Sequence, residues 1–147
     1  MKILTLFTVF FAAAFFYSSS VNMAIAGKEV IIEIKERFFI AQTNEIYLNA
    51  QDYIGKTVKY EGIFNVYESD INGKKRYFVI RYGPGCCIFD ATAGFEVYWN
   101  KQYPNQNDWV EVVGVVEEYD EKGIKYLRLA LNSLTVLQKR GKETVTR

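Results

Sequence analysis

Two segments of this chain share a spacing in which a valine is followed four positions later by a glycine and then by another β-branched residue. The first segment runs from Val58 to Ile63 around Gly62, and the second runs from Val110 to Val115 around Gly114. A glycine inside a strand marks a bulge or a sharp bend. A small sheet closes into a barrel only when curvature of this kind is built in at defined positions. The repeated spacing therefore favours a closed or partly open Greek-key barrel.

The two glycine-bent segments belong to a series of five predicted strands. Asn72-Gly73 lies between the first two strands and is a strong signal for a tight hairpin. The five strands are predicted at residues 58–66, 76–82, 95–99, 109–118 and 124–137. Their number and the first hairpin favour an OB-like Greek-key barrel. The alternative is an open antiparallel sheet that packs on a helix.

A helix is predicted from Arg37 to Leu48, before the barrel strands. Five of its residues fall on one helical stripe: Phe39, Ile40, Thr43, Ile46 and Tyr47. The β-branched segment from Glu29 to Ile34 predicts a short strand ahead of the helix. The predicted fold is therefore mainly β, with one N-terminal helix.

Residues 1–26 have the pattern of a cleavable signal peptide. Met1 and Lys2 precede an apolar run, and Ala24-Ile25-Ala26 provides small residues at the positions that a signal peptidase accepts. The apolar run of roughly 15 residues is shorter than the ~20 that a membrane-spanning helix needs. We therefore expect export to the periplasm, the cell envelope or the medium. The mature chain is expected to form one domain over residues 27–137, with a flexible polar tail at 138–147 and no membrane span.

Charge and composition exclude several classes of function. Once Lys2 is removed with the leader, basic and acidic side chains balance at 17 each. A chain without basic excess is poorly suited to neutralise phosphates, which argues against a nucleic-acid partner. The chain contains no histidine, which excludes mechanisms that depend on imidazole. We therefore expect a protein that is not an enzyme.

The two cysteines of the chain are adjacent, at Cys86 and Cys87, and follow a Gly-Pro-Gly turn. Neighbouring Cα atoms lie about 3.8 Å apart, which is below the usual disulfide range of roughly 4.4–6.8 Å. A bond between these cysteines is possible only as a strained, easily reduced ring. Together with Asp90, the two thiols could also form a partial site for a divalent ion such as zinc. A third interpretation is that one cysteine packs in the core while the other points outward.

Three further residues are candidates for a binding site. Arg81 precedes the cysteines and favours the thiolate form that binds metals and attacks disulfides. Trp99 and Trp109 flank a polar loop and provide a possible surface for stacking a ligand. Alternatively, the two tryptophans close one end of the barrel.

The segment around the cysteines resembles the C-terminal domain of YcgQ-like proteins, a bacterial family. The shared features are Arg81, the pair Cys86-Cys87, the step Asp90-Ala91 and a strand that begins at Gly94. The similarity covers about residues 29–137. It implies an extracytoplasmic domain that is linked to metal-ion handling and is paired with a membrane permease.

The sequence thus predicts an exported, non-enzymatic domain that handles a metal ion or a small ligand in the cell envelope. A first alternative is a thiol-dependent redox protein that uses the Cys86-Cys87 pair. A second alternative is an envelope module that binds another envelope protein.

Overall fold

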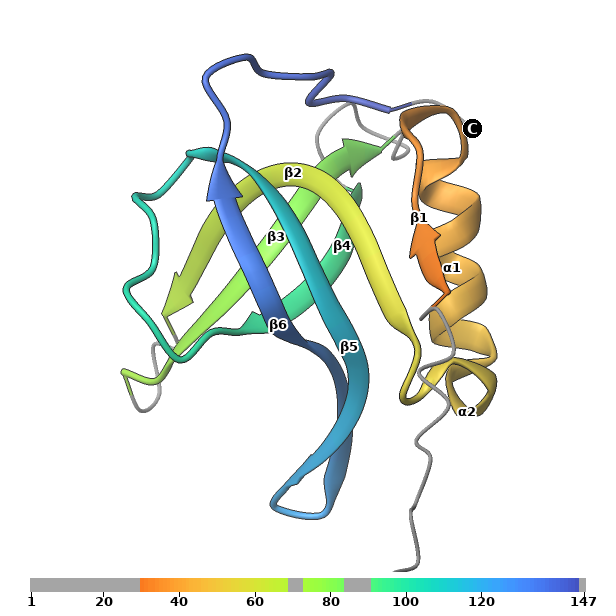
Figure 1. Cartoon of the computed structure of the whole chain (residues 1–147). Helices are drawn as coiled ribbons and strands as arrows, with labels where there is room; N and C mark the ends of the chain where they lie inside the picture. The colour runs from red at the N-terminus through yellow and green to blue at the C-terminus, as the bar shows by residue number, and fades with distance from the viewer. Residues whose placement is uncertain (1–29, 69–72, 84–90, 146–147) are drawn as a thin grey trace, which may run out of the picture.

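A computed structural model describes residues 30–68, 73–83 and 91–145 of the chain. Its first half contains strand β1 (Ile31–Glu33), a 3₁₀ turn η1 (Glu36–Phe38) and helices α1 (Phe39–Leu48) and α2 (Ala50–Tyr53). Five longer strands follow, as Figure 1 shows: β2 (Thr57–Glu68), β3 (Lys75–Gly83), β4 (Ala91–Tyr98), β5 (Trp109–Glu121) and β6 (Ile124–Val136). No helix within the described ranges has the length and hydrophobicity needed to cross a membrane.

The five long strands form a closed barrel. The strand order is β1-β2-β3-β4-β6-β5, and β5 also pairs with β2, which closes the sheet. The pairing of β4 with β6 is parallel, and the other barrel pairs are antiparallel. The predicted OB-like barrel is therefore confirmed, and the open sheet that was the alternative is wrong.

Both predicted glycines lie where the barrel bends. Strand β2 pairs with β5 from Thr57 to Ile63 and with β3 from Ile63 to Glu68, so that Gly62 lies directly before the change of partner. Gly114 follows a register shift in the β5–β6 ladder. A β-carbon added at Gly62 would lie 2.8 Å from the carbonyl oxygen of Ile80. The strands thus approach each other too closely for a larger residue at this bend.

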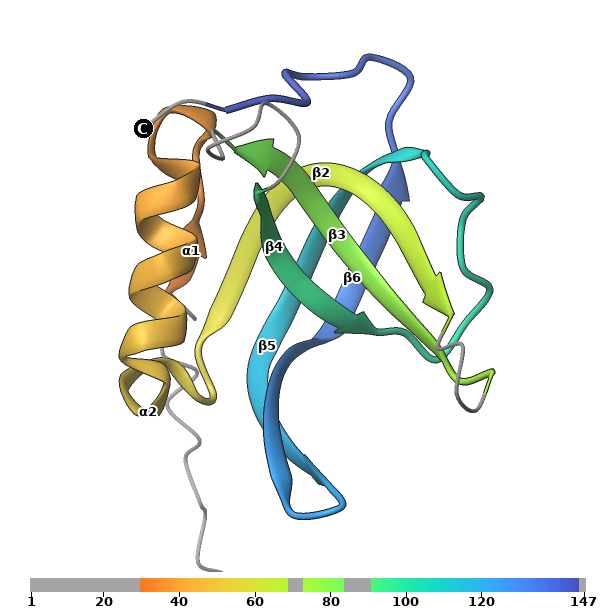
Figure 2. The same ribbon diagram turned by 180° about the vertical axis from the view of Figure 1, so that it is seen from behind.

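Helix α1 covers the end of the barrel at which β3 finishes and β4 begins. Its buried residues are Phe39, Thr43 and Ile46, which are three members of the predicted stripe. Thr43 is a poor helix former, but its hydroxyl donates to the carbonyl of Phe39 at 2.8 Å, so that the polar group is satisfied inside the core. Figure 2 shows the helix beside β4, seen from behind. The helix precedes all five barrel strands in the chain.

The barrel core consists of inward-facing residues of every long strand. Fully or almost fully buried side chains include Val58, Tyr60, Phe64, Val79, Phe95, Val97, Val110, Val112, Val116 and Leu129. The hydroxyl of Tyr60 donates to the carbonyl of Val79 at 2.8 Å, and the ring of Tyr60 packs edge-on against Phe39 and Phe95. The core therefore joins the helix to the barrel.

The segment after β6 is held against the barrel as far as Val145, although the sequence predicts a flexible polar tail there. Val145 is 3% exposed and belongs to the core cluster. The amide of Tyr82 donates to Glu143, and the amide of Val145 donates to Tyr82, both at 2.8 Å. The C-terminal segment thus lies along the end of β3 (Figure 1).

Candidate functional site

Arg81 is the predicted site residue with the most contacts in the described part of the chain. It lies on β3 and is 4% exposed. Its Nε donates to the carbonyl of Glu61 at 2.7 Å, and its Nη1 donates to the carbonyl of Lys142 at 3.2 Å. The same Nη1 lies 3.4 Å from a carboxylate oxygen of Glu36. Arg81 therefore connects η1, β2 and the C-terminal segment.

The guanidinium of Arg81 also contacts two aromatic rings. Its central carbon lies 5.1 Å from the ring centre of Phe39 and 4.9 Å from that of Trp109. Trp109 is 2% exposed, and its indole nitrogen donates to the carboxylate of Glu61 at 3.1 Å. Burial lowers the pKa of Arg81, and the charges of Glu36 and Glu61 oppose this effect. An arginine remains protonated under such conditions, so the site contains a permanent buried cation.

The two cysteines follow Arg81 in the connection between β3 and β4. Gly83 and Ala91 form the last antiparallel pair before this connection. Cys86, Cys87 and Asp90 all belong to residues 84–90, which lie outside the described residues. The pairing of β3 with β4 therefore fixes the two ends of the segment that contains all three predicted metal ligands.

A cleft of about 850 Å³ lies beside the end of β3. Glu36, Phe38 and Ile40 line it from η1 and α1, and Lys142 and Thr144 line it from the C-terminal segment. Thr144 pairs with Tyr82, which is two residues before Pro84. Two partners of Arg81, Glu36 and Lys142, are among the residues that line this cleft.

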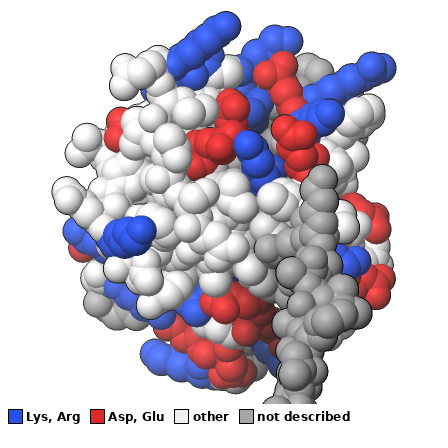
Figure 3. All heavy atoms as spheres, in the orientation of Figure 1, with Lys and Arg blue, Asp and Glu red and all other residues white. Residues whose placement is uncertain are grey.

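Charged residues of both signs surround this end of the molecule. Lys142 lies 3.3 Å from a carboxylate oxygen of Glu36, and hydrogen bonding and charge from Lys142 help to hold the pKa of Glu36 below its usual value, against the opposing effect of burial. Figure 3 shows interspersed Lys, Arg, Asp and Glu side chains along the upper edge, where the C-terminal segment runs. Within the described ranges, no group of three His, Cys, Asp or Glu side chains is placed to hold a metal ion.

The structure places the two tryptophans in different surroundings. Trp109 begins β5 inside the protein and stacks on Arg81, whereas Trp99 directly follows β4 and is half-buried. The ammonium of Lys101 lies 5.0 Å from the ring centre of Trp99. Trp109 thus belongs to the surroundings of Arg81, and no contact of Trp99 with them is found among the described residues.

Sequence reasoning missed Glu36 and Lys142, although both bind Arg81. They lie 45 and 61 positions away from it in the chain. Neither residue belongs to a motif, and an exposed lysine near a chain end gives no signal of a buried partner. Only the packing of the C-terminal segment on β3 reveals their role.

Comparison with families of known proteins gave one match. The family model described as the DUF1980 C-terminal domain matches residues 17–142. The match covers the whole barrel, the helices, the cysteine pair and most of the C-terminal segment, and it begins within the predicted signal peptide. It confirms the predicted resemblance to YcgQ-like proteins. No curated protein and no solved structure matches the chain significantly.

Proposed function

Since the chain belongs to the family of DUF1980 C-terminal domains, we propose that it is an exported binding domain that takes up a thiophilic divalent metal ion through Cys86, Cys87 and Asp90. The single observation that carries this proposal is the position of Arg81. A permanent cation is buried five residues before Cys86 and binds Glu36 and Lys142, which line a cleft of about 850 Å³.

The donor set suits a borderline ion such as zinc. Two thiolates and one carboxylate supply three ligands, and zinc sites take four. The fourth position is left to water, to another carboxylate or to a partner. A site with an open position suits uptake and transfer of an ion better than permanent structural binding. This supports a role in metal handling.

Arg81 supports the proposal through its charge. A nearby cation stabilises a thiolate relative to a thiol, and the thiolate is the form that binds a metal ion. Arg81 keeps its charge because three oxygen atoms and two aromatic rings surround it.

The predicted signal peptide and the family resemblance support a location in the cell envelope. There we propose a membrane permease or another envelope protein as the partner that delivers or receives the ion. The cleft beside β3 provides a surface on which such a partner could complete the coordination of the metal.

Titration of the reduced protein with Co²⁺ tests this proposal, because cobalt thiolates absorb strongly in the near ultraviolet. We expect one equivalent of Co²⁺ to saturate this band in the wild type. The double variant Cys86→Ser/Cys87→Ser should lose the band and keep its melting temperature. Asp90→Asn should weaken the binding of Co²⁺ through loss of a carboxylate ligand, whereas its matched control Asp52→Asn, which changes an exposed carboxylate of α2, should bind like the wild type.

Two results would overturn the proposal. The first is a wild-type protein that gives no thiolate band, and the second is a double variant that gives the same band as the wild type. If Cys86 and Cys87 bind no metal but cycle between the dithiol and the disulfide, the result would instead support the alternative of a thiol-dependent redox protein. A large loss of stability in the double variant, with metal binding retained, would assign the cysteines to core packing.

A further inference from the structure

The cleft of about 850 Å³ beside the end of β3 has an apolar lining. Four apolar residues of η1, α1 and the C-terminal segment contribute to it: Phe38, Ile40, Ala41 and Val145. Val145 is 3% exposed, whereas the large side chain of Phe38 is 53% exposed. An apolar ring that remains half open to solvent at the side of a cleft offers contact surface to a binding partner.

The two segments to which the lining residues belong carry an excess of positive charge. Residues 35–44 and 138–145 together have five basic and two acidic side chains, in a chain whose formal net charge is +1. Both acidic residues, Glu36 and Glu143, already pair with basic residues of the protein itself. Figure 3 shows basic side chains that project from the upper edge, where the C-terminal segment runs. This end of the molecule therefore attracts a negatively charged partner.

Two of these cations line the cleft and are open to solvent, namely Arg37 of η1 and Lys142 of the C-terminal segment. Among the described residues, the guanidinium of Arg37 contacts the ring of Phe38, at 5.6 Å, rather than a carboxylate. The side chain of Lys142 is 77% exposed, and its ammonium lies 3.3 Å from Glu36. Because an exposed ion pair contributes little, Lys142 can also pair with a carboxylate of a partner.

The C-terminal segment also has an unpaired backbone edge at Thr144. The amide of Tyr82 donates to the carbonyl of Glu143, and the amide of Val145 donates to the carbonyl of Tyr82. Successive residues of an extended chain direct their N–H and C=O groups to opposite sides, so those of Thr144 point away from β3. Neither group has a backbone partner among the described residues, and Thr144 lines the cleft. An extended peptide can pair with such an edge.

We propose that this cleft binds an extended segment of a partner protein in which acidic residues flank apolar ones. The backbone of the segment pairs with Thr144, and an apolar side chain packs on Phe38. Its carboxylates pair with Arg37 and Lys142. This inference rests on the proposed function in one respect, because it gives the chemistry of the envelope protein that delivers or receives the ion. The docking itself does not involve the cysteines.

An anionic membrane surface is the competing partner for a basic region with an exposed phenylalanine. The shape of the region favours a peptide. A cleft of about 850 Å³ has the size of sites that enclose a bound molecule, whereas a bilayer surface cannot enter a cleft. A bilayer also offers no row of N–H and C=O groups to pair with Thr144. We therefore choose the peptide and use the membrane as a comparison.

The test uses the full mature protein without metal and two acidic probes, the peptides Glu-Glu-Leu-Val-Glu-Glu and Glu-Glu-Phe-Val-Glu-Glu. Comparison peptides have glutamine or lysine in place of every glutamate, and vesicles of phosphatidylglycerol or phosphatidylcholine represent the membrane. Fluorescence anisotropy measures affinity, and amide shifts in NMR spectra locate the site. We expect an acidic peptide to shift the amides of Phe38, Ala41 and Thr144, and to bind more weakly as salt rises.

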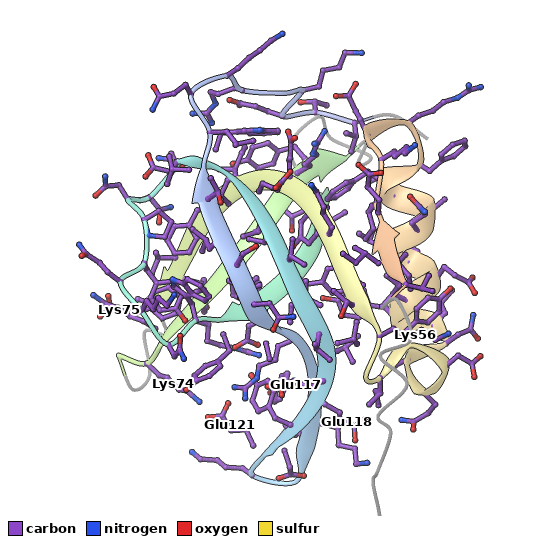
Figure 4. The ribbon with its side chains drawn as sticks, viewed as in Figure 1. Lys56, Lys74, Lys75, Glu117, Glu118 and Glu121 are labelled. Carbon is purple, nitrogen blue, oxygen red and sulfur yellow. The ribbon has the colours of Figure 1, made fainter. Side chains whose placement is uncertain are left out.

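Two pairs of variants test the side chains. Arg37→Gln/Lys142→Gln should weaken binding of the acidic peptide by about tenfold. Its matched control, Lys56→Gln/Lys75→Gln, removes the same charge from two exposed lysines that Figure 4 shows away from the C-terminal segment, and should bind like the wild type. Phe38→Ala should weaken binding by about fivefold.

Leu48→Ala is the matched control for Phe38→Ala. It removes another exposed apolar side chain, at the other end of α1, and should leave the affinity unchanged. A third pair tests the backbone. Thr144→Pro removes the N–H group that points away from β3 and should weaken binding by about fivefold, whereas Thr144→Val keeps this group and should bind like the wild type. All the changed residues are exposed, so we expect melting temperatures near that of the wild type.

Four outcomes would overturn the proposal. The first is the absence of shifts with both acidic peptides, and the second is equal or tighter binding of the glutamine or lysine peptides. The third is binding to phosphatidylglycerol vesicles without binding of the acidic peptides, which would assign the region to a membrane. The fourth is unchanged affinity in both Arg37→Gln/Lys142→Gln and Phe38→Ala.

The outcome is separate from that of the cobalt titration. The Cys86→Ser/Cys87→Ser variant should bind the acidic peptides like the wild type, because the docking contacts come from η1, α1 and the C-terminal segment. A protein that binds Co²⁺ but neither acidic peptide would contradict only the docking site. A protein that binds an acidic peptide at the cleft but no Co²⁺ would contradict only the metal site.

Discussion

The guanidinium of Arg81 is held by oxygen atoms from three separate segments of the chain. Two are the carbonyls of Glu61 and Lys142, and the third is the carboxylate of Glu36. Hydrogen bonds to a charged group contribute roughly 1.5–3 kcal/mol each, and contact with aromatic rings adds to this when the cation is buried. One side chain thus joins η1, β2 and the C-terminal segment.

Replacement of Arg81 by lysine should destabilise the protein by about 2–3 kcal/mol, because a lysine cannot reproduce the planar fork or the stacking. Urea unfolding measures the change. Arg37→Lys is the matched control, since Arg37 is exposed on η1, and it should shift the free energy of unfolding by less than about 0.5 kcal/mol. Equal stability of the two variants would show that the contacts of Arg81 contribute little.

The role of Arg81 could be predicted only in part from the sequence. Its place before the cysteines made it a candidate from the sequence, but a basic residue within a strand gives no hint of burial. The contact with Trp109 was missed for the same reason. Trp109 was predicted either to stack a ligand or to close the barrel end, and the structure shows it stacked on an internal cation.

At the scale of the strands, the two glycine bends determine how the sheet closes. Gly62 precedes the point where β2 stops pairing with β5 and begins to pair with β3. Gly114 follows the register shift between β5 and β6. At Gly114 an added β-carbon would lie 2.9 Å from the carbonyl oxygen of Ala130. Because that oxygen belongs to the backbone, the sheet itself would have to move.

We therefore expect Gly62→Val and Gly114→Val each to lower the free energy of unfolding by at least about 2 kcal/mol, as in overpacked cores. Ser133→Val adds the same side chain at an exposed position of β6 and should change the free energy of unfolding by less than about 0.5 kcal/mol. Thermal and urea unfolding measure all three variants. Glycine variants that are as stable as Ser133→Val would mean that barrel closure does not require these bends.

The elements that the sequence predicted are those with a local signal. The glycine spacing, the Asn72-Gly73 hairpin and the helical stripe each lie within about a dozen residues, and the barrel and α1 follow from them. The C-terminal segment lacked such a signal, because its residues are polar and only Val145 is buried deeply. Its place on β3 depends on contacts that span some sixty residues.

At the scale of the whole molecule, the composition predicts an unusual dependence of stability on pH. The chain has no histidine, so no imidazole titrates near neutral pH. Burial raises the pKa of Tyr119 from 10.0 to about 12, and the neighbouring carboxylate of Glu96 adds to this. Burial also raises the pKa of Tyr60. Both tyrosines therefore stabilise the folded state only while they are protonated.

Because these pKa values are raised on folding, the stabilisation is complete below about pH 10 and is lost as the pH rises toward 12. We expect the free energy of unfolding of the Cys86→Ser/Cys87→Ser protein to stay nearly constant from pH 6 to 9 and to fall above pH 10. Tyr119→Phe should reduce the alkaline loss, and the exposed control Tyr67→Phe should not. A decline that begins near neutral pH would contradict this account.

The central claim is that the cysteine segment binds a metal ion in the cell. The most direct test is native mass spectrometry of the protein purified from its own cells without chelators, combined with a count of free thiols after denaturation. The account predicts one divalent metal ion per chain and two reduced cysteines once the metal is removed. A metal-free chain, whether Cys86 and Cys87 are free thiols or joined in a disulfide, would contradict it.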